Sequence, residues 1–232
     1  MSLIFSKYSV FDENVCALVN TVNCVGFMGA GIALEFKLRY PKLFEDYKVK
    51  CEEKKIKIGY MDFYKVEDEN NHILIVNFPT KFDYKKPSKM EWIEWGLDNF
   101  VRTYKNQNIK KIAFPILGTS NGGLNRDAVI ELMHNKLRNL DGIDIIICED
   151  KELKKDGIES QMIEHLDEVI KRITYLKSPQ RETLNNLLAS GVKRFRDIKG
   201  NGIGKITYEK IHNECYLAVI NKKQAQPNLF TI

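Results

Sequence analysis

Residues 20–33 read Asn-Thr-Val-Asn-Cys-Val-Gly-Phe-Met-Gly-Ala-Gly-Ile-Ala. The apolar run before them, at 17–19, predicts a buried strand, and residues 34–40 after them predict a helix that ends before Pro41. A strand, a glycine-rich turn and a helix in this order can bind a phosphate, because glycine lets an anion approach the backbone and the helix N-terminus presents N–H groups. Asn20 and Asn23 can add amide hydrogen bonds to a sugar. The alternative is a tight turn without a ligand.

Strand and helix signals alternate over the first 150 residues. Strands are expected at 17–20, 60–66, 72–78, 111–116 and 144–148, and helices at 32–40, 41–53, 88–105 and 127–140. Such alternation is typical of an α/β domain with a parallel or mixed sheet. The polar stretch 150–155 marks a boundary, so we expect an α/β domain at 1–152 and a small all-α module at 153–232. In that module we expect one helix at about 160–176, a stop or restart at Pro179, and short helices beyond.

A second glycine-rich segment, residues 117–124, follows the strand expected at 111–116 and reads Leu-Gly-Thr-Ser-Asn-Gly-Gly-Leu. Its backbone N–H groups and hydroxyls suit a phosphate, and Asn125 or Asp127 can cap the next helix. Ligands of open α/β sheets bind outside the carboxyl ends of the strands, where both loops fall. We therefore expect the two loops to face one ligand, the alternative being a surface loop with no ligand.

The remaining composition points to a cytoplasmic protein. No apolar stretch is long enough to cross a bilayer, and the N-terminus lacks a secretory pattern, so no membrane partner is expected. The five cysteines include no Cys-x-x-Cys pair, so we expect no metal site. Cys24 lies in the first glycine-rich turn and is a candidate nucleophile by position only, since no histidine is near it in sequence.

Three segments carry a resemblance to a known family. They are Asn-Thr-Val-Asn with Met-Gly-Ala-Gly-Ile-Ala at 20–33, Asn-Phe-Pro-Thr-Lys at 77–81, and Phe-Pro-Ile-Leu-Gly at 114–118. Together they resemble the macrodomain of the DarG antitoxins, which is related to the terminal ADP-ribose glycohydrolase of animals. The resemblance covers roughly residues 1–150. It implies a macrodomain-like mixed sheet between helical layers, ADP-ribose as ligand and product, and no cofactor.

The resemblance also implies which residues touch the ligand. Asn20 and Asn23 would lie near the distal ribose, with Asn23 closest to its reacting carbon. The other ADP-ribose contacts would be Val25, Gly26, Met28, Gly29, Ala30, Gly31, Ile32, Pro79, Thr80, Leu117, Gly118, Thr119, Ser120, Asn121, Gly122, Gly123 and Leu124. The position of the acidic residue that holds adenine in many macrodomains is occupied by Ser9.

Lys81 is the candidate catalytic residue, together with Asn23. The residues alone make Lys81 one lysine among several that follow a strand, whereas the resemblance gives it a role at the C1″ carbon of the ribose. It could attack that carbon once desolvation lowers its pKa, or stabilise charge as the glycosidic bond breaks. The animal glycohydrolase carries an acidic catalytic residue in the second loop, whereas this chain has Asn121-Gly122-Gly123 there, as in DarG-type loops.

The net charge of +5 lies entirely in the C-terminal part. Residues 1–150 hold 21 basic and 21 acidic side chains, and residues 151–232 hold 15 and 10. Residues 195–211 resemble half of a helix-hairpin-helix motif, whose Gly-h-Gly turn (h is apolar) binds a DNA phosphate without reading sequence. The candidate nucleic-acid contacts are Arg194, Arg196, Lys199, Gly202, Gly204 and Lys205. The alternative is a glycine turn in a helical module that docks on the first domain or on a protein.

The resemblance therefore implies an ADP-ribosyl glycohydrolase that removes ADP-ribose from a modified nucleic acid, with a DNA base favoured. It would reverse a DNA ADP-ribosyltransferase toxin, as an antitoxin or a DNA repair enzyme. The expected partners are ADP-ribose, ADP-ribosylated DNA and a DarT-like toxin. Two alternatives stay open: a reader that binds ADP-ribose without cleaving it, and a hydrolase of ADP-ribosylated protein carboxylates.

Overall fold

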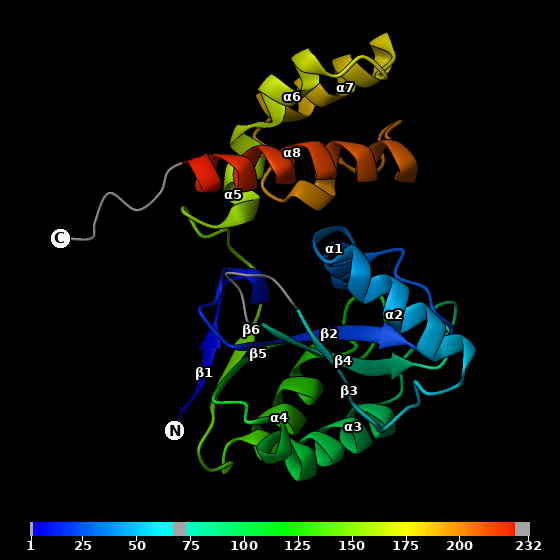
Figure 1. Cartoon of the computed structure of the whole chain (residues 1–232), viewed down its shortest axis with the longest axis vertical. Coiled ribbons are helices and arrows are strands. Elements are labelled where there is room, and N and C mark those ends of the chain that lie inside the picture. Colours follow the sequence, from blue (N-terminus) through cyan, green and yellow to red (C-terminus); the bar gives the residue numbers. More distant parts are fainter. Residues whose placement is uncertain (1, 67–72, 226–232) are drawn as a thin grey trace, which may run out of the picture. The chain divides into compact units, whose positions relative to one another are not determined.

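The computed structural model describes residues 2–66 and 73–225. The chain divides into two compact units, Met1–Glu152 and Leu153–Ile232. Figure 1 shows a sheet flanked by helices in the first unit and helices in the second. The turn expected at 67–71 lies outside the described residues.

The described part of the first unit contains a six-stranded mixed sheet in the order β1-β6-β5-β2-β4-β3. Only its edge pair β3–β4 is antiparallel; β1–β6, β6–β5, β5–β2 and β2–β4 run parallel. The strand bounds are β1 Leu3–Ser6, β2 Ala17–Asn23, β3 Asp62–Lys65, β4 Leu74–Lys81, β5 Lys111–Pro115 and β6 Asp144–Cys148.

Helices cover both faces of this sheet (Figure 1). α1 Gly31–Arg39 and α2 Pro41–Glu52 lie on one face, and α3 Met90–Thr103 and α4 Arg126–Leu137 on the other. Side chains of β2 alternate between the layers, because successive strand residues point to opposite faces. Ala17 and Val19 join the core with α3 and α4, whereas Leu18 packs with Phe36 of α1. The expected mixed sheet between helical layers is confirmed.

The central strands run further than their apolar patterns predicted. β2 continues to Asn23 and β4 to Lys81, past the expected ends at 20 and 78. In the parallel ladder Asn20 pairs with Asn77, and Asn23 pairs with Lys81 after a register shift at Val22. Ladder hydrogen bonds come from the backbone, so polar side chains do not end a strand. The edge strand β1, which pairs with β6, was not expected at all.

The second unit is helical. Its elements are α5 Ile158–Glu164, α6 Leu166–Arg172, α7 Ser178–Ala189, a 3-10 turn at Phe195–Ile198 and α8 Lys205–Ala225. The single helix expected at about 160–176 is wrong, because α5 ends and α6 begins at His165. Pro179 does restart a helix: it lies in the first turn of α7, where a missing N–H costs nothing.

The expectation of only short helices beyond Pro179 is also wrong. α8 is 21 residues long and packs against α5 and α6. Its buried side chains recur every three or four residues, at Tyr208, Ile211, Cys215 and Val219, so one face of the helix completes the core of the unit. No helix among the described residues is long and apolar enough to span a membrane.

The position of β4, and so of Lys81, depends on close packing of α3. A Cβ atom on Gly96 would lie 2.3 Å from the ring of Phe78, which is fully buried in β4. Alanine raises helix propensity by about 1 kcal/mol over glycine. Overpacking a core costs about 1–3 kcal/mol.

We therefore expect Gly96→Ala to lower the free energy of unfolding despite its better helix propensity, with Glu131→Ala, exposed on α4, as the control. Urea denaturation of both variants measures the change. A Gly96→Ala protein more stable than the wild type would contradict the close packing of α3 on β4.

Candidate functional site

The carboxyl ends of the central strands bring the predicted site residues together. Asn23 and Lys81 are paired at the ends of β2 and β4, and β5 leads into the second loop, residues 117–124. The ammonium group of Lys81 donates a hydrogen bond to the backbone carbonyl of Asn121 in that loop. A Cβ atom on Gly31 would lie 2.8 Å from Nδ2 of Asn121. The first loop, the second loop and Lys81 therefore meet at one place.

The side chain of Asn23 organises the first loop, residues 24–30. Its Oδ1 accepts hydrogen bonds from the N–H groups of Val25 at 3.0 Å and Phe27 at 3.3 Å, and its Nδ2 donates to the carbonyl of Phe27 at 2.5 Å. The hydroxyl of Tyr47, on α2, donates to the Asn23 carbonyl at 2.7 Å and lies 3.1 Å from its Oδ1. Asn23 was expected beside the ribose, and in this structure its amide shapes the first loop.

The start of α1 is built for an anion. Gly31 begins the helix with φ +56°, a left-handed conformation that favours glycine. The preceding residue, Ala30, is the N-cap and offers no side-chain acceptor to the first-turn N–H groups. These N–H groups, with the positive end of the helix dipole, suit a phosphate.

Asn20 occupies a different position from the one expected. It is fully buried, and its Nδ2 donates to Oδ1 of Asn77 at 2.9 Å. Nδ2 of Asn77 donates in turn to Asp62 at 2.9 Å, and Asp62 also pairs with Lys50 of α2 at 2.7 Å. This polar chain links β2, β4, β3 and α2. Oδ1 of Asn20 has no hydrogen-bond partner among the described residues.

The second loop is folded tightly on itself. The N–H of Leu124 donates to the carbonyl of Gly118 at 3.1 Å. The N–H of Ser88 donates to the carbonyl of Gly122 at 2.9 Å. A Cβ atom on Gly122 would lie 2.1 Å from the Gly118 oxygen, so this position admits only glycine. Of the two expected capping residues, Asn125 caps α4 by accepting from the N–H of Ala128 at 3.0 Å.

The remaining expected contacts differ in exposure, which decides how each could meet a ligand. Val25, Ala30, Gly31, Ser120, Asn121 and Gly123 are exposed. Gly26, Ile32, Gly118, Thr119 and Leu124 are half-buried, whereas Met28, Gly29, Pro79, Thr80, Leu117 and Gly122 are buried. The buried members support the loops from beneath.

Burial lowers the pKa of Lys81 below the ordinary lysine value. Its ammonium group also lies 3.4 Å from the carbonyl of Tyr84. Desolvation disfavours the charged form of an amine, whereas the two carbonyl acceptors hold the side chain in place. Lys81 can therefore act either as a positioned hydrogen-bond donor or, in its neutral fraction, as a nucleophile.

Two other candidates have structural roles. Burial raises the pKa of Cys24 to about 11, so its thiol stays protonated near neutral pH and is a poor nucleophile. The buried Ser9 caps a 3-10 turn at Val10–Asp12: its hydroxyl accepts from the N–H of Phe11 at 3.4 Å, and its own N–H donates to Asp12.

Sequence reasoning missed Tyr47, Asn77 and Asp62. Tyr47 lies on the buried face of α2, and only the hydrogen bond from its hydroxyl to Asn23 reveals a role at the loop. Asn77 offered one signal that was not used, namely a polar residue in the middle of an apolar strand pattern. Buried polar side chains require partners, and Asn20 on the neighbouring strand is the partner here.

In the second unit, residues 200–204 form a tight turn before α8. Gly200 and Ile203 exchange backbone hydrogen bonds at 3.0 and 2.7 Å, and Gly202 has φ +84°. Gly202 and Gly204 are exposed, with open space where a Cβ would lie. The turn follows a 3-10 turn and precedes a helix, as in half of a helix-hairpin-helix.

The basic residues beside this turn fall into two groups. Arg196 and Lys199 are exposed. Lys205 is half-buried, and its ammonium nitrogen lies 3.8 Å from a carboxylate oxygen of Glu209. Arg194 was expected to contact nucleic acid, yet it is buried and ion-paired with Glu159 at 3.3 Å. Glu159 also accepts from the N–H of Phe195 at 2.6 Å, so this pair fixes the segment that enters the turn.

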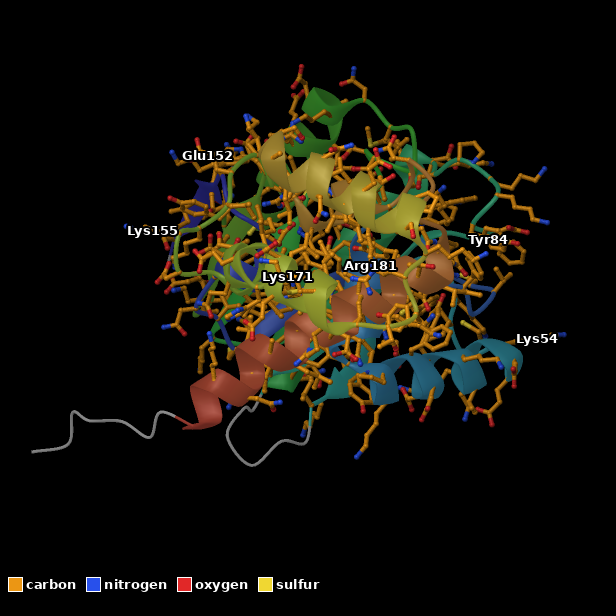
Figure 2. The ribbon with its side chains drawn as sticks, turned by 90° about the horizontal axis from the view of Figure 1, so that it is seen from above. Lys54, Tyr84, Glu152, Lys155, Lys171 and Arg181 are labelled. Carbon is orange, nitrogen blue, oxygen red and sulfur yellow. The ribbon has the colours of Figure 1, made fainter. Side chains whose placement is uncertain are left out.

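A cavity of about 350 Å³ lies between α6 and α7, where Lys171 and Arg181 are neighbours (Figure 2). The guanidinium of Arg181 donates to the carbonyls of Ile170 and Ile173. The cavity contains none of the predicted site residues.

Comparisons with known proteins agree with this geometry. The Macro domain family model matches residues 19–133. A DNA ADP-ribosyl glycohydrolase of Mycobacterium tuberculosis is 41% identical over 131 residues, which are 56% of this chain and 37% of that protein. Another from Thermus aquaticus is 37% identical over 153 residues, or 66% of this chain and 42% of that protein. The chain thus matches about two fifths of these relatives' length.

Solved structures give the same result. The macrodomain of Mycobacterium tuberculosis DarG superposes with TM-score 0.61 and 37% identity, covering 63% of this chain and 97% of that one. Thermosipho africanus DarTG in complex with ADP-ribose superposes with TM-score 0.60 and 31% identity, covering 64% of this chain and 42% of that one.

The burial of Lys81 makes a prediction about its titration. The lysines are labelled with ¹³C-methyl groups, and the Lys81 resonance is assigned as the one that is missing in the Lys81→Arg variant. This resonance should titrate at a lower pH than that of an ordinary lysine, because burial disfavours the ammonium form. NMR measures the midpoint. A midpoint at or above the ordinary lysine value would contradict the described environment of Lys81.

Proposed function

Because the chain belongs to the macrodomain family, we propose that its first unit binds ADP-ribose between the two glycine-rich loops and releases it from modified DNA. One observation carries this proposal. Lys81 ends the strand next to Asn23 and donates a hydrogen bond to Asn121, so a single amine touches the second loop beside the first. The names of the relatives support DNA as the carrier of the ADP-ribose.

The loops hold the ligand through their backbones. The diphosphate accepts hydrogen bonds from the first-turn N–H groups of α1 and from the N–H groups of exposed second-loop residues, such as Ser120 and Asn121. The distal ribose lies over the end of β2, where Asn23 keeps the first loop in its bound shape. Rigid loops lower the entropy lost on binding.

Lys81 then assists cleavage of the bond between ribose C1″ and the base. Its ammonium group donates to the departing base and stabilises the negative charge that builds there, and water adds to C1″. The base recovers a proton, and ADP-ribose leaves with a hydroxyl on C1″. Direct attack by the neutral amine is the other route: the C1″–N bond to Lys81 forms as the bond to the base breaks, and the base takes up the proton that the amine loses. The ribosyl-lysine adduct opens to an imine, which water hydrolyses to release ADP-ribose and which borohydride, on this route alone, reduces and traps.

The second unit extends the contact with DNA. Arg196, Lys199 and the turn at Gly202–Gly204 form a basic exposed edge that suits phosphate oxygens without reading bases. Because Arg194 is engaged with Glu159, it supports this edge rather than touching DNA.

The biological context follows from the relatives. A Thermosipho africanus relative, 32% identical over 147 residues, joins a DNA ADP-ribosyl transferase to a DNA ADP-ribosyl glycohydrolase in one chain. This pairing supports a DarT-like toxin as the source of the modified DNA. The five cysteines are free, which fits a reducing compartment such as the cytoplasm.

The reaction is tested with an ADP-ribosylated DNA oligonucleotide. We expect the wild type and the control Lys57→Ala, which removes an exposed lysine, to release ADP-ribose. Lys81→Ala should lose at least about a hundredfold in rate, as for a positioned charge or proton donor. Chromatography measures the released ADP-ribose. If the wild type and Lys81→Ala release it at equal rates, Lys81 has no part in the mechanism.

If the wild type binds ADP-ribose and releases none from DNA, the protein is a reader. Release from modified glutamate and not from DNA would instead favour a hydrolase of protein carboxylates.

Joint use of the loops predicts a binding defect in Gly31→Ala. The added Cβ would lie 2.8 Å from Nδ2 of Asn121 at a left-handed φ, so the backbone at position 31 is strained and the Asn121 side chain must move away from the start of α1. We expect the affinity for free ADP-ribose, measured by calorimetry, to fall about tenfold or more, equivalent to about 1.4 kcal/mol.

Gly142→Ala is the matched control, since Gly142 also has a positive φ, +73°, but has open space around it and lies in a turn before β6. Equal affinities for the two variants would contradict a ligand shared by both loops.

A further inference from the structure

An exposed aromatic cluster lies beside the candidate site. The rings of Phe27 and Tyr84 stack with centroids 4.3 Å apart and planes 30° apart. Each residue is 41% exposed, and Phe82 is 63% exposed. Figure 2 shows Tyr84 at the outer edge of the chain. The stacked pair is thus an exposed apolar patch, to which Phe82 adds exposed aromatic surface two residues earlier in the chain than Tyr84; exposed apolar patches are unfavourable in water and mark interaction sites.

The cluster is tied to both sides of the site. Phe27 belongs to the first loop, where its N–H and its carbonyl are both bound by the amide of Asn23. Gly29 leaves room for the Phe27 ring, because a Cβ there would lie 2.3 Å from it. On the other side, the carbonyl of Tyr84 lies 3.4 Å from the ammonium group of Lys81. The stacked pair therefore spans from the loop organised by Asn23 to Lys81.

The surroundings of the cluster are basic. Between residues 81 and 89 the chain carries four lysines and one acid, Asp83. Lys85, Lys86 and Lys89 are exposed, and the Lys85 ammonium lies 5.6 Å from the centroid of the Tyr84 ring. The Asp83 carboxylate accepts a hydrogen bond from the N–H of Lys85 at 2.9 Å, so it folds the turn that presents these lysines. Aromatic rings among lysines are the pattern of a surface that binds single-stranded nucleic acid.

We propose that Phe27, Phe82 and Tyr84 form a stacking platform for the bases of single-stranded DNA, with Lys85, Lys86 and Lys89 on its phosphates. The proposal rests on the proposed function, because the strand concerned is the one that carries the ADP-ribosylated base. A base can stack on a protein ring only when the face of the base is free. In a duplex the neighbouring bases cover these faces. The platform thus selects an unpaired or extruded base and holds its neighbours while the ADP-ribose occupies the loops.

The test uses the full chain and an unmodified, fluorescently labelled single strand, so that it does not depend on hydrolysis. The double variant Phe82→Ala/Tyr84→Ala should lower the affinity for the single strand about tenfold or more, since stacking contributes about 1–3 kcal/mol per base. Tyr60→Ala is the matched control, because Tyr60 is also an exposed aromatic residue, 61% exposed. Tyr84→Phe keeps the ring and should keep the affinity.

Two further readouts separate the platform from other roles. Affinity for free ADP-ribose, measured by calorimetry, should change less than about twofold in the double variant, whose folding is checked by its melting temperature. Lys85→Gln/Lys86→Gln should lower the slope of log affinity against log salt by about one to two units, and Lys57→Gln should not.

Unchanged affinity for the single strand in the double variant overturns the proposal. So does an equal loss for duplex DNA, or a loss of ADP-ribose affinity as large as the loss for DNA. None of these outcomes bears on whether the wild type releases ADP-ribose, so failure of the platform and failure of the hydrolase are distinguished.

Discussion

The site depends on the parallel pairing of β2 with β4, which sets Asn23 beside Lys81 at the carboxyl ends of two buried strands. A lysine on a surface loop would be solvated and mobile, and it would offer little to catalysis. At the end of a packed strand, Lys81 is partly desolvated, and the carbonyl of Asn121 fixes its ammonium group. The same bond fastens the second loop to the strand, so the side chain to which we assign the chemistry also fixes the geometry.

Buried polar groups, rather than apolar packing, give the site its shape. Asn23 and the Tyr47 hydroxyl hold the first loop, and a chain of hydrogen bonds from Asn20 through Asn77 to Asp62 links the strands that carry the site, although Oδ1 of Asn20 has no partner among the described residues. Such networks are costly when broken, because each unpaired buried group carries its full desolvation penalty. The hydrogen bonds of Asn23 define the path of the first loop, which contains Gly26 and Gly29.

The sequence predicted the fold of the first unit well, and it brought the candidate site residues to the ends of the correct strands without predicting their side-chain partners. Periodicity located β2 to β6 and α1 to α4 but not the edge strand β1, and the glycine-rich segments located the loops. It could not predict the lengths of β2 and β4, because backbone pairing continues through Asn23 and Lys81 although the apolar pattern stops. Nor could it predict that Asn20, Asn23 and Arg194 use their side chains inside the protein, since their partners Asn77, Phe27 and Glu159 follow from tertiary packing.

The central claim is that one ADP-ribose spans both loops with its reacting carbon at Lys81. A crystal structure of the protein with ADP-ribose tests it most directly. We expect a diphosphate hydrogen-bonded to backbone N–H groups of both loops, and ribose C1″ about 3.5 Å from the Lys81 ammonium nitrogen, close enough for Lys81 to act on the departing base or on C1″ itself. A ligand that touches one loop only, or a distal ribose remote from Lys81, would contradict it.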